Sequence, residues 1–315
     1  MESTARLSNL SVVFYAFAAM HGDAFMISSE NSSILVDGGM PGTYGEIKRK
    51  VLDSKLDAVF VTHVDLDHIG GIIKLISDDE VDLTNCTFYM NHPDLVPYDE
   101  SGLVAYHHGD TLKKLTQRRS LKLEQVLEND SISIGDFSIE VLSPKASDVT
   151  ELHKNWNASR VIEDGELSYK ERQVNNGDIV NRSSIAKILK CGDISILLLA
   201  DSHPDAVINH LKNKSYSSNK PLSLDLVKLS HHGSQHNTSE ELLEMLDCTN
   251  YYISTNGSKF NHPDVETITM LQAHALNSDK IFNIYLNYQI DNEIILRCET
   301  DLSNLRFVHQ KEVMF

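Results

Sequence analysis

Four potential metal ligands follow one short apolar run of the chain. Residues 59–61 are apolar, and His63, Asp65, Asp67 and His68 come directly after them, just before a Gly-Gly pair. Side chains two residues apart at a strand end point the same way, so the first three can converge, with His68 approaching from the turn into a helix. Clustered carboxylates and imidazoles beside a buried strand are costly without a compensating charge. The spacing therefore predicts a divalent metal centre.

The rest of the pattern indicates the elements that position these ligands. Short apolar runs between turn residues predict strands, and longer amphipathic runs predict helices. The expected strands are 11–17, 25–28, 33–36, 58–61, 131–134, 137–142, 185–189, 194–199 and 226–229. The expected helices are 46–56, 111–127, 204–212, 239–246 and 265–275, and a tail from 281 to 308 alternates like paired strands. This order predicts an α/β fold with two packed sheets and helices outside.

Composition fits one ordinary globular domain spanning 1–315, with 41% hydrophobic and 23% charged residues. The polar segment 145–180 holds the only Trp and is expected to be a long surface insertion. No apolar stretch is long enough to span a bilayer, so we expect no membrane contact and a cytoplasmic location. Four scattered cysteines are expected to be reduced thiols.

The formal net charge is −17, which argues against a conventional nucleic-acid binder with a basic face. It does not exclude a nuclease, because two bound divalent ions would make the site locally positive.

Residues 59–71 resemble the His-x-His-x-Asp-His signature of the metallo-β-lactamase superfamily, with Asp65 in place of the second His. This variant is similar to the hydrolase domain of ComEC-type competence proteins. Further motifs of that pattern occur in the same order: HGDA at 21–24, LVDGG at 35–39, NRSS at 181–184, LLLAD at 197–201, KLSHHGS at 228–234 and NHP at 261–263. The ordered set covers nearly the whole chain, and it implies a four-layer αββα metallo-β-lactamase sandwich.

The resemblance also implies a role for each ligand. His63 and Asp65 would hold one metal, Asp67 and His68 the other, and Asp201 would bridge them. The remaining assigned residues are His231 as a further ligand, His232 as its substitute, and Asp37 as a carboxylate that orients ligands. Adjacent strand residues face opposite ways, so we expect only one of the two neighbouring histidines to point inward.

Other positions carry open alternatives. Asn181 and Ser184 stand where many relatives place another His ligand, so they would either bind metal or contact the substrate or the ligands. His262 resembles a residue that faces the leaving group, but it could also be a histidine at the start of a helix. The expected catalytic residues are Asp67 and His262.

The chemistry implied is hydrolysis by two divalent ions that share a water and convert it to hydroxide near neutral pH. Oxygen ligands such as Asp65 favour Mn²⁺, and Zn²⁺ is the second choice. The ComEC-like motifs imply a phosphodiesterase or nuclease acting on DNA. Similar soluble proteins look like effectors of bacterial defence systems that are paired with a protease or an ATPase. The alternatives are a small-molecule hydrolase, such as a cyclic-nucleotide phosphodiesterase or a lactonase, and an inactive metal-stabilised binding module.

Overall fold

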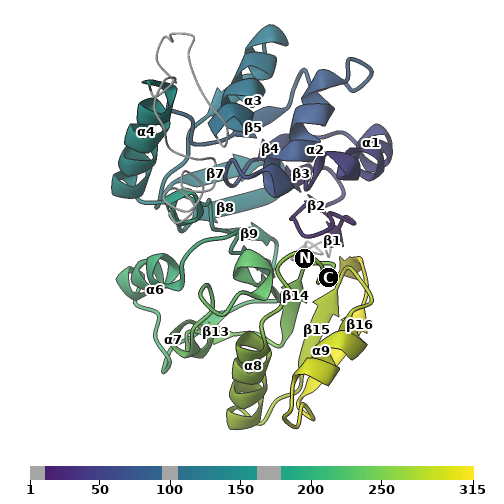
Figure 1. The fold of residues 1–315 in the computed structure, drawn as a ribbon, viewed down its shortest axis with the longest axis vertical. Helices are drawn as coiled ribbons and strands as arrows, with labels where there is room; N and C mark the ends of the chain where they lie inside the picture. Colours follow the sequence, from purple (N-terminus) through teal and green to yellow (C-terminus); the bar gives the residue numbers. More distant parts are fainter. Residues whose placement is uncertain (1–10, 94–105, 162–178) are drawn as a thin grey trace, which may run out of the picture.

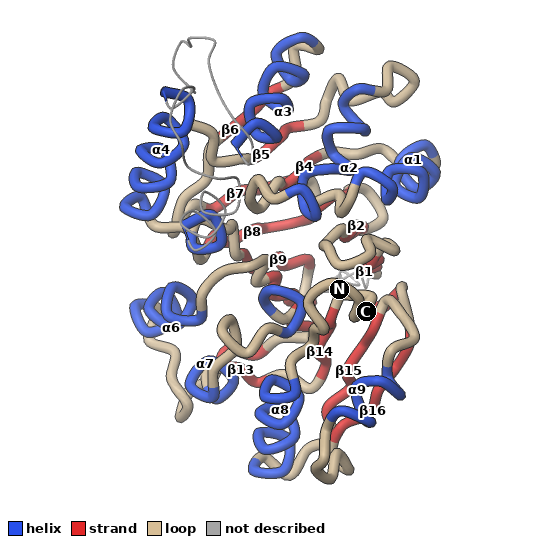
Figure 2. Tube along the Cα trace, viewed as in Figure 1, coloured by secondary structure: helices blue, strands red, loops and turns tan. Residues whose placement is uncertain are grey.

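The computed structural model describes residues 11–93, 106–161 and 179–315 (Figure 1). Within these residues, a seven-stranded sheet and an eight-stranded sheet form the centre of the molecule. Helices lie on the outer face of each sheet, and Figure 2 shows the helices at the periphery and the strands inside. The fold is the expected four-layer αββα sandwich.

The first sheet has the order β17-β1-β2-β3-β4-β5-β6. Its strands are β1 (Val13–Ala16), β2 (Phe25–Ser28), β3 (Ser33–Val36), β4 (Ala58–Phe60), β5 (Thr87–Tyr89), β6 (Lys122–Glu124) and β17 (Glu312–Met314). The helical elements of this half are η1 (Pro41–Thr43), α1 (Tyr44–Leu52), α2 (Leu66–Ser77), α3 (Tyr106–Arg118) and α4 (Ala146–Val161). The four strands from β3 to β6 are parallel neighbours, and α1, α2 and α3 lie between them in the chain.

The second sheet has the order β16-β15-β14-β12-β10-β9-β8-β7, and a small sheet pairs β11 with β13. The strands are β7 (Ser131–Ile134), β8 (Phe137–Val141), β9 (Lys187–Cys191), β10 (Ile194–Leu198), β11 (Leu222–Ser223), β12 (Leu226–Lys228), β13 (Leu246–Asp247), β14 (Asn250–Ile253), β15 (Phe282–Leu286) and β16 (Leu305–His309). The helical elements are α6 (Pro204–Asn213), η2 (Ser230–Gly233), α7 (Glu240–Glu244), α8 (Val265–Asn277) and α9 (Asp291–Arg297).

The two faces of the first sheet are both buried, which explains its nearly continuous apolar strands. Alternate side chains point to opposite faces of a strand. Phe14, Ile27 and Phe60 join the core between the two sheets. Met26 and Val59 belong to the core that packs under the helices. Alternation along each strand thus builds two apolar layers at once.

Two expected elements are wrong in type. The predicted helix 111–127 is α3 followed by strand β6, because the chain leaves the helix at Ser120, which has a left-handed φ of 53°. The predicted strand pair of the tail contains helix α9, since β15 and β16 are parallel and parallel strands need a crossover.

The polar segment 145–180 is also corrected in part. Its first half is helix α4, and Trp156 on that helix is fully buried, with its ring 4.8 Å from the His92 ring. Residues 162–178 lie outside the described residues. The polar composition of this segment did not predict helix α4, which contributes the large Trp156 side chain to the core.

None of the described helices is long and apolar enough to cross a membrane. All four cysteines are buried and free, as expected for reduced thiols.

Candidate metal centre

The candidate ligands follow the carboxyl ends of strands in both sheets. Asp37 follows β3 and His63 follows β4, and these two strands are parallel. Asp201 follows β10 and His231 follows β12, which are also parallel. Carboxyl ends of parallel strands share one edge of a sheet, so the topology brings side chains that are far apart in sequence to one edge of the sandwich.

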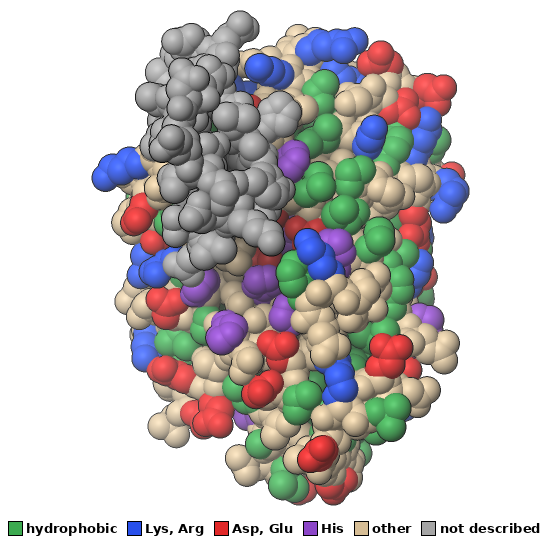
Figure 3. Space-filling view, in the orientation of Figure 1, with side chains coloured by type: hydrophobic (Ala, Val, Ile, Leu, Met, Phe, Trp, Pro, Cys, Tyr) green, Lys and Arg blue, Asp and Glu red, His purple; other side chains and the backbone are tan. Residues whose placement is uncertain are grey.

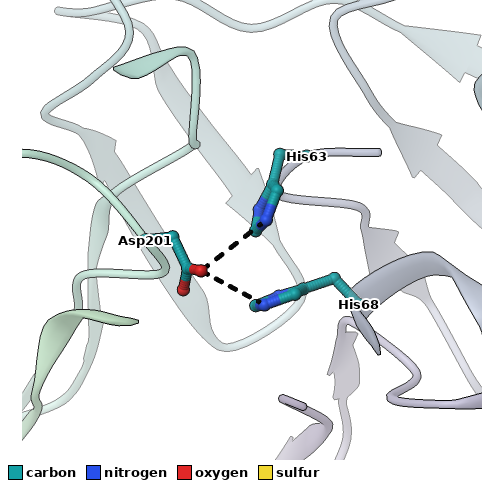
Figure 4. A group of neighbouring side chains, drawn as sticks. All are labelled: His63, His68 and Asp201. Atoms are coloured by element: carbon teal, nitrogen blue, oxygen red, sulfur yellow. Dashed lines mark ion pairs between the residues drawn. The ribbon is translucent and has the colours of Figure 1, made fainter. Parts of the chain in front are cut away.

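Three histidines surround the carboxylate of Asp201. The Nε2 atoms of His63, His68 and His231 lie 3.8, 3.5 and 3.6 Å from Asp201 Oδ2. Figure 4 shows the first two rings pointing at the carboxylate from the opposite sheet. Nε2 of His63, Nε2 of His68 and Oδ1 of Asp201 are buried and have no hydrogen-bond partner among the described residues. Buried ligand atoms that face one another in this way fit a bound cation.

A second group shares one residue with the first. Ligand atoms of Asp67, His68 and His232 all lie within 4.8 Å of one another. Nε2 of His232 is also buried without a hydrogen-bond partner in the described part of the chain. Asp65 is close by, with its Oδ2 3.8 Å from His63 Nε2. The two groups overlap at His68, so the residues fit a pair of neighbouring cations.

Supporting contacts fix the ring orientations. His68 Nδ1 lies 2.9 Å from Asp37 Oδ2. Asp37 also accepts hydrogen bonds from the backbone N–H and the hydroxyl of Thr62, at 2.8 and 2.7 Å. His63 Nδ1 lies 3.1 Å from Thr62 Oγ1 and 3.3 Å from Ser184 Oγ. With each Nδ1 engaged, Nε2 of both rings is left for a metal, an arrangement usual around metal-binding histidines.

The neighbouring histidines 231 and 232 both face the centre, so the expectation that only one points inward is wrong. They lie in the turn η2, not on a strand, and both have left-handed backbone, with φ of 44° and 56°. His232 is buried and donates from Nδ1 to the carbonyl of Ser254 at 2.8 Å. The His231 side chain is 28% exposed and places Nδ1 3.2 Å from Asn237 Oδ1. The turn lets each ring approach a different group of ligands.

A fully buried ion pair stands behind His232. Lys228 Nζ contacts Asp23 Oδ2, and Asp23 Oδ1 lies 3.3 Å from His232 Nδ1. Burial alone would raise the pKa of Asp23, but Lys228 and His232 hold it well below its ordinary range. The motifs at 21–24 and 228–234 contain Asp23 and Lys228, but no role was predicted for either residue, because the two positions lie 205 residues apart in the chain.

The electrostatics of the ligand cluster favour a cation. Burial alone would lower the pKa of His68, but the carboxylates of Asp201 and Asp37 raise it well above its ordinary value. Burial alone would raise the pKa of Asp201, but His231, His68 and His63 hold it well below its usual range. Without metal, a protonated His68 therefore balances an ionised Asp201. A divalent cation would displace that proton, as is usual when metal binds to histidine.

Of the remaining predicted residues, Ser184 and His262 have contacts with candidate ligands. Ser184 contacts the His63 ring, whereas Asn181 Oδ1 is buried with no hydrogen-bond partner in the described residues. The His262 ring lies 5.7 Å from the His231 ring, and its Nδ1 is 3.1 Å from Asp264 Oδ1. His262 therefore borders the centre from the second sheet.

The sequence resembles a known family and a known protein. Residues 19–86 match the family model of the metallo-beta-lactamase superfamily. Over 226 residues, 70% of the chain, the sequence is 24% identical to ComE operon protein 3 of Bacillus subtilis (strain 168). The match covers 23% of that protein, so the chain corresponds to about a quarter of this curated relative.

The chain is also similar to proteins of solved structure. The metallo-beta-lactamase fold protein YhfI from Bacillus subtilis is similar with a TM-score of 0.51 and 14% identity, over 98% of this chain and 99% of that chain. A diphosphatase from the PhnP family is similar with a TM-score of 0.47 and 12% identity, over 98% of this chain and 97% of that chain. The chain thus has the metallo-β-lactamase fold, and its resemblance to the metallo-β-lactamase superfamily and to ComE operon protein 3 is confirmed.

Proposed function

We propose that this chain is a metal-dependent hydrolase that cleaves phosphodiester bonds, with DNA as its substrate. The carrying observation is a set of buried ligand atoms around Asp201 that have no hydrogen-bond partner within residues 11–93, 106–161 and 179–315, next to a second set that shares His68. Two adjacent cation positions suit enzymes that hydrolyse phosphodiesters, because each charge can stabilise one side of the displacement. The metallo-β-lactamase fold supports the coarse class of metal-dependent hydrolase.

The residues present define how the ions would be held. His63 and Asp65 would hold one ion, with His231 completing its ligands, and Asp201 would lie between the two ions. Asp67, His68 and His232 would hold the other. Divalent ions bound here would supply an activated water and neutralise charge on the phosphoryl oxygens. Asp37 would keep the His68 ring in place through the 2.9 Å contact with its Nδ1.

His262 is the proposed proton donor to the leaving oxygen. Its Nδ1 contact with Asp264 leaves Nε2 as the nitrogen that can exchange a proton. Burial lowers the pKa of His262, and Asp264 only partly opposes this shift. The free protein at neutral pH then holds a mostly neutral ring, and a bound phosphate would raise its pKa. We expect His262→Ala to slow cleavage more than it weakens substrate binding.

The metal is proposed to be Mn²⁺ or Zn²⁺. Three carboxylates, from Asp65, Asp67 and Asp201, add oxygen ligands that favour Mn²⁺, while the imidazoles suit Zn²⁺. Protein purified without chelator is expected to carry up to two divalent ions per chain, measured by elemental analysis. Absence of metal even after reconstitution with Mn²⁺ and Zn²⁺ would contradict the proposal.

A second candidate is a small-molecule hydrolase, such as a cyclic-nucleotide phosphodiesterase or a lactonase. The observation that favours it is the net charge of −17, which disfavours a polyanionic substrate. A defence-system role, a protease or ATPase partner and a cytoplasmic location stay predictions of the sequence.

Hydrolysis assays on a panel of substrates test the proposal. Metal-loaded protein would be incubated with labelled linear DNA, RNA, a cyclic dinucleotide, a simple phosphodiester and a lactone. The expected result is metal-dependent cleavage of DNA that chelator abolishes. Turnover of the lactone alone would overturn the phosphodiesterase proposal, and no turnover of any substrate by metal-loaded protein would favour the inactive binding module.

A further inference from the structure

One exposed aromatic side chain borders the candidate metal centre. Phe260 lies in the connection between β14 and α8 and is 52% exposed. Its ring centroid is 6.0 Å from that of His21 and 6.1 Å from that of His262. A large apolar ring is thus held in solvent between two polar rings.

Both neighbours of Phe260 reach the candidate ligands. His21 Nε2 lies 4.0 Å from Asp67 Oδ2, and the His262 ring centroid lies 5.7 Å from that of His231. Phe260 is therefore one side chain away from the ligands of both proposed cations. In Figure 3, histidine side chains gather in the middle of one face, with hydrophobic and basic side chains at their margin.

The loop that carries the ring is held by contacts from two other segments, one of which is itself bonded to Tyr288. The guanidinium of Arg297 donates to the carbonyl of Asn261. The backbone N–H of Asn256 donates to the carbonyl of Met20 at 2.8 Å, and the N–H of Met20 donates to the Tyr288 hydroxyl at 2.7 Å. These bonds tie the loop to the segment that carries His21. Because these bonds restrict the loop backbone, less conformational entropy is lost when a flat group stacks on the Phe260 ring.

We propose that Phe260 is a stacking platform for an unpaired nucleobase next to the phosphodiester that is cut. The inference rests on the proposed function and names its substrate class. Aromatic side chains bind bases of any sequence through their ring faces. Lys259 Nζ lies over the Phe260 ring, 4.6 Å from its centroid, so a base would stack on the other ring face, with this cation near its adjoining phosphate. In a chain of net charge −17, an apolar contact of this kind would add to the affinity that the metal ions supply.

The platform also restricts the form of the substrate. A base in a duplex already stacks on its neighbours and must leave them to reach a side chain, which costs free energy. A single strand, a strand end or a small nucleotide presents a free base face. The inference therefore predicts that single-stranded DNA or a cyclic dinucleotide is bound better than a blunt duplex of the same sequence.

Steady-state kinetics on matched oligonucleotides test the platform. The two substrates are a single strand and the same strand with abasic residues on both sides of the scissile phosphate. Phe260→Ala is expected to raise KM for the intact strand by roughly five- to tenfold, at the low end of alanine effects on base stacking, and so to reduce the preference for the intact strand. Phe260→Trp keeps an aromatic ring and should retain the wild-type preference for the intact strand. Leu276→Ala, at a 61% exposed position at the end of α8, is the control and should change neither substrate.

Equal effects of Phe260→Ala on intact and abasic strands would overturn the platform, as would no effect on either.

A binding measurement keeps this outcome separate from failure of the proposed function. The indole introduced by Phe260→Trp should be quenched by a phosphorothioate single strand and by a cyclic dinucleotide but not by the abasic strand. The chain has one natural Trp, and it is buried, so the introduced signal is separable. If wild type cleaves nothing, the proposed function fails, while absence of quenching by any base-containing ligand rejects the platform itself.

Discussion

Asp201 is the residue on which the candidate centre depends most. Its Oδ2 lies within 3.8 Å of three imidazole nitrogens, and its side chain is only 4% exposed. The backbone carbonyl of Asp201 accepts from Asn237 Nδ2, whereas Oδ1 of the side chain has no hydrogen-bond partner in the described residues. The carboxylate is therefore placed for a ligand and not for capping a helix.

We expect Asp201→Asn to lose metal and at least about a hundredfold in turnover, because an amide cannot supply the negative charge that balances two cations. The fold should remain, since the side chain is similar in size. Elemental analysis, kinetics and thermal unfolding would be compared with Asp193→Asn in the exposed turn between β9 and β10. Normal metal content and near-normal turnover in Asp201→Asn would contradict the bridging role.

The buried Lys228–Asp23 pair gives a second prediction at this scale. Lys228→Met leaves Asp23 buried without its main cation, which is expected to cost about 3–5 kcal/mol of unfolding free energy. The double variant Asp23→Asn, Lys228→Met should recover most of that stability. Its metal affinity should still be about 10- to 100-fold weaker, because His232 loses the carboxylate beside Nδ1.

Titration calorimetry with Zn²⁺ and chemical unfolding would separate the two effects. Wild-type affinity in the double variant would show that the pair serves stability alone. Unchanged stability of Lys228→Met would instead show that the cation is dispensable.

At this scale, the sequence predicted groups of residues that are close together in the chain better than contacts between distant residues. His63, Asp65, Asp67 and His68 were recognisable because they fall within six positions after one strand. The orientation of the His231 and His232 rings depends on two left-handed φ angles, which a residue pattern does not encode. The ion pair between Asp23 and Lys228 joins positions 205 residues apart, so no local sequence pattern indicated it.

At the scale of elements, short strands between turn residues were predicted best. β2, β3 and β7 have the expected bounds, because the turn residues on both sides limit where each short strand can begin and end. The missed elements are short or amphipathic, such as β6, whose three residues are only partly buried or exposed. Helix α9 was missed because its alternating neighbours suggested a direct pairing, whereas β15 and β16 are parallel.

Strand β9 contains an unusual buried amine. Lys187 is fully buried, donates from Nζ to the carbonyl of Ile185 at 3.3 Å and lies 4.9 Å from the Phe60 ring centroid. Burial lowers the pKa of Lys187 to about 8, although the Asp37 carboxylate opposes the shift. An unfolded lysine has a pKa of about 10.4. Between about pH 8 and about 10.4 the unfolded chain keeps a proton that the folded chain has released, so this group makes stability rise with pH in that window.

Lys187→Met should therefore stabilise the protein at pH 7, by up to about 3 kcal/mol, since it removes the cost of burying a charge. The gain over wild type should shrink as the pH rises from about 8 to about 10.4. Urea unfolding at several pH values measures both effects. Lys190→Met, at the exposed position of the same strand, is the control and should show no such pH dependence. Destabilisation of Lys187→Met at pH 7 would show that attraction to Asp37 outweighs burial.

At the scale of the whole molecule, the centre exists only because the two sheets pack together. Its ligands come from residues 63–68 on one side and 201–232 on the other, and both sets follow strands whose inner faces form the core between the sheets. The candidate ligands could be named from motifs in order along the chain. The overlap of the two ligand groups at His68 depends on the packing of the two halves, which no single motif specifies.

Charge is the other property of the whole molecule that bears on function. The formal net charge is −17. A cavity is lined by Lys145, Arg182 and His203, but Asp148 and Asp205 line it as well. The cations there are matched by carboxylates, so this cavity adds little net positive charge for a phosphate backbone.

DNA binding should then be weak, dependent on metal and only mildly sensitive to salt. If the two metal positions and Lys259 neutralise one to three phosphates of a single strand, the logarithm of the association constant should fall against the logarithm of salt concentration with a slope of roughly −0.7 to −2. A dedicated binder that neutralises six to ten phosphates of a single strand would give about −4 to −7.

Fluorescence anisotropy with a phosphorothioate single strand, across a salt series with Mn²⁺ and with chelator, measures the slope and the metal dependence. A slope steeper than about −4, or equal affinity with chelator, would show a broad basic surface instead. Cleavage of a cyclic dinucleotide in the same series, with DNA untouched at every salt concentration, would replace the nuclease by the small-molecule hydrolase, because the metals would then act on a substrate that needs no long polyanion site.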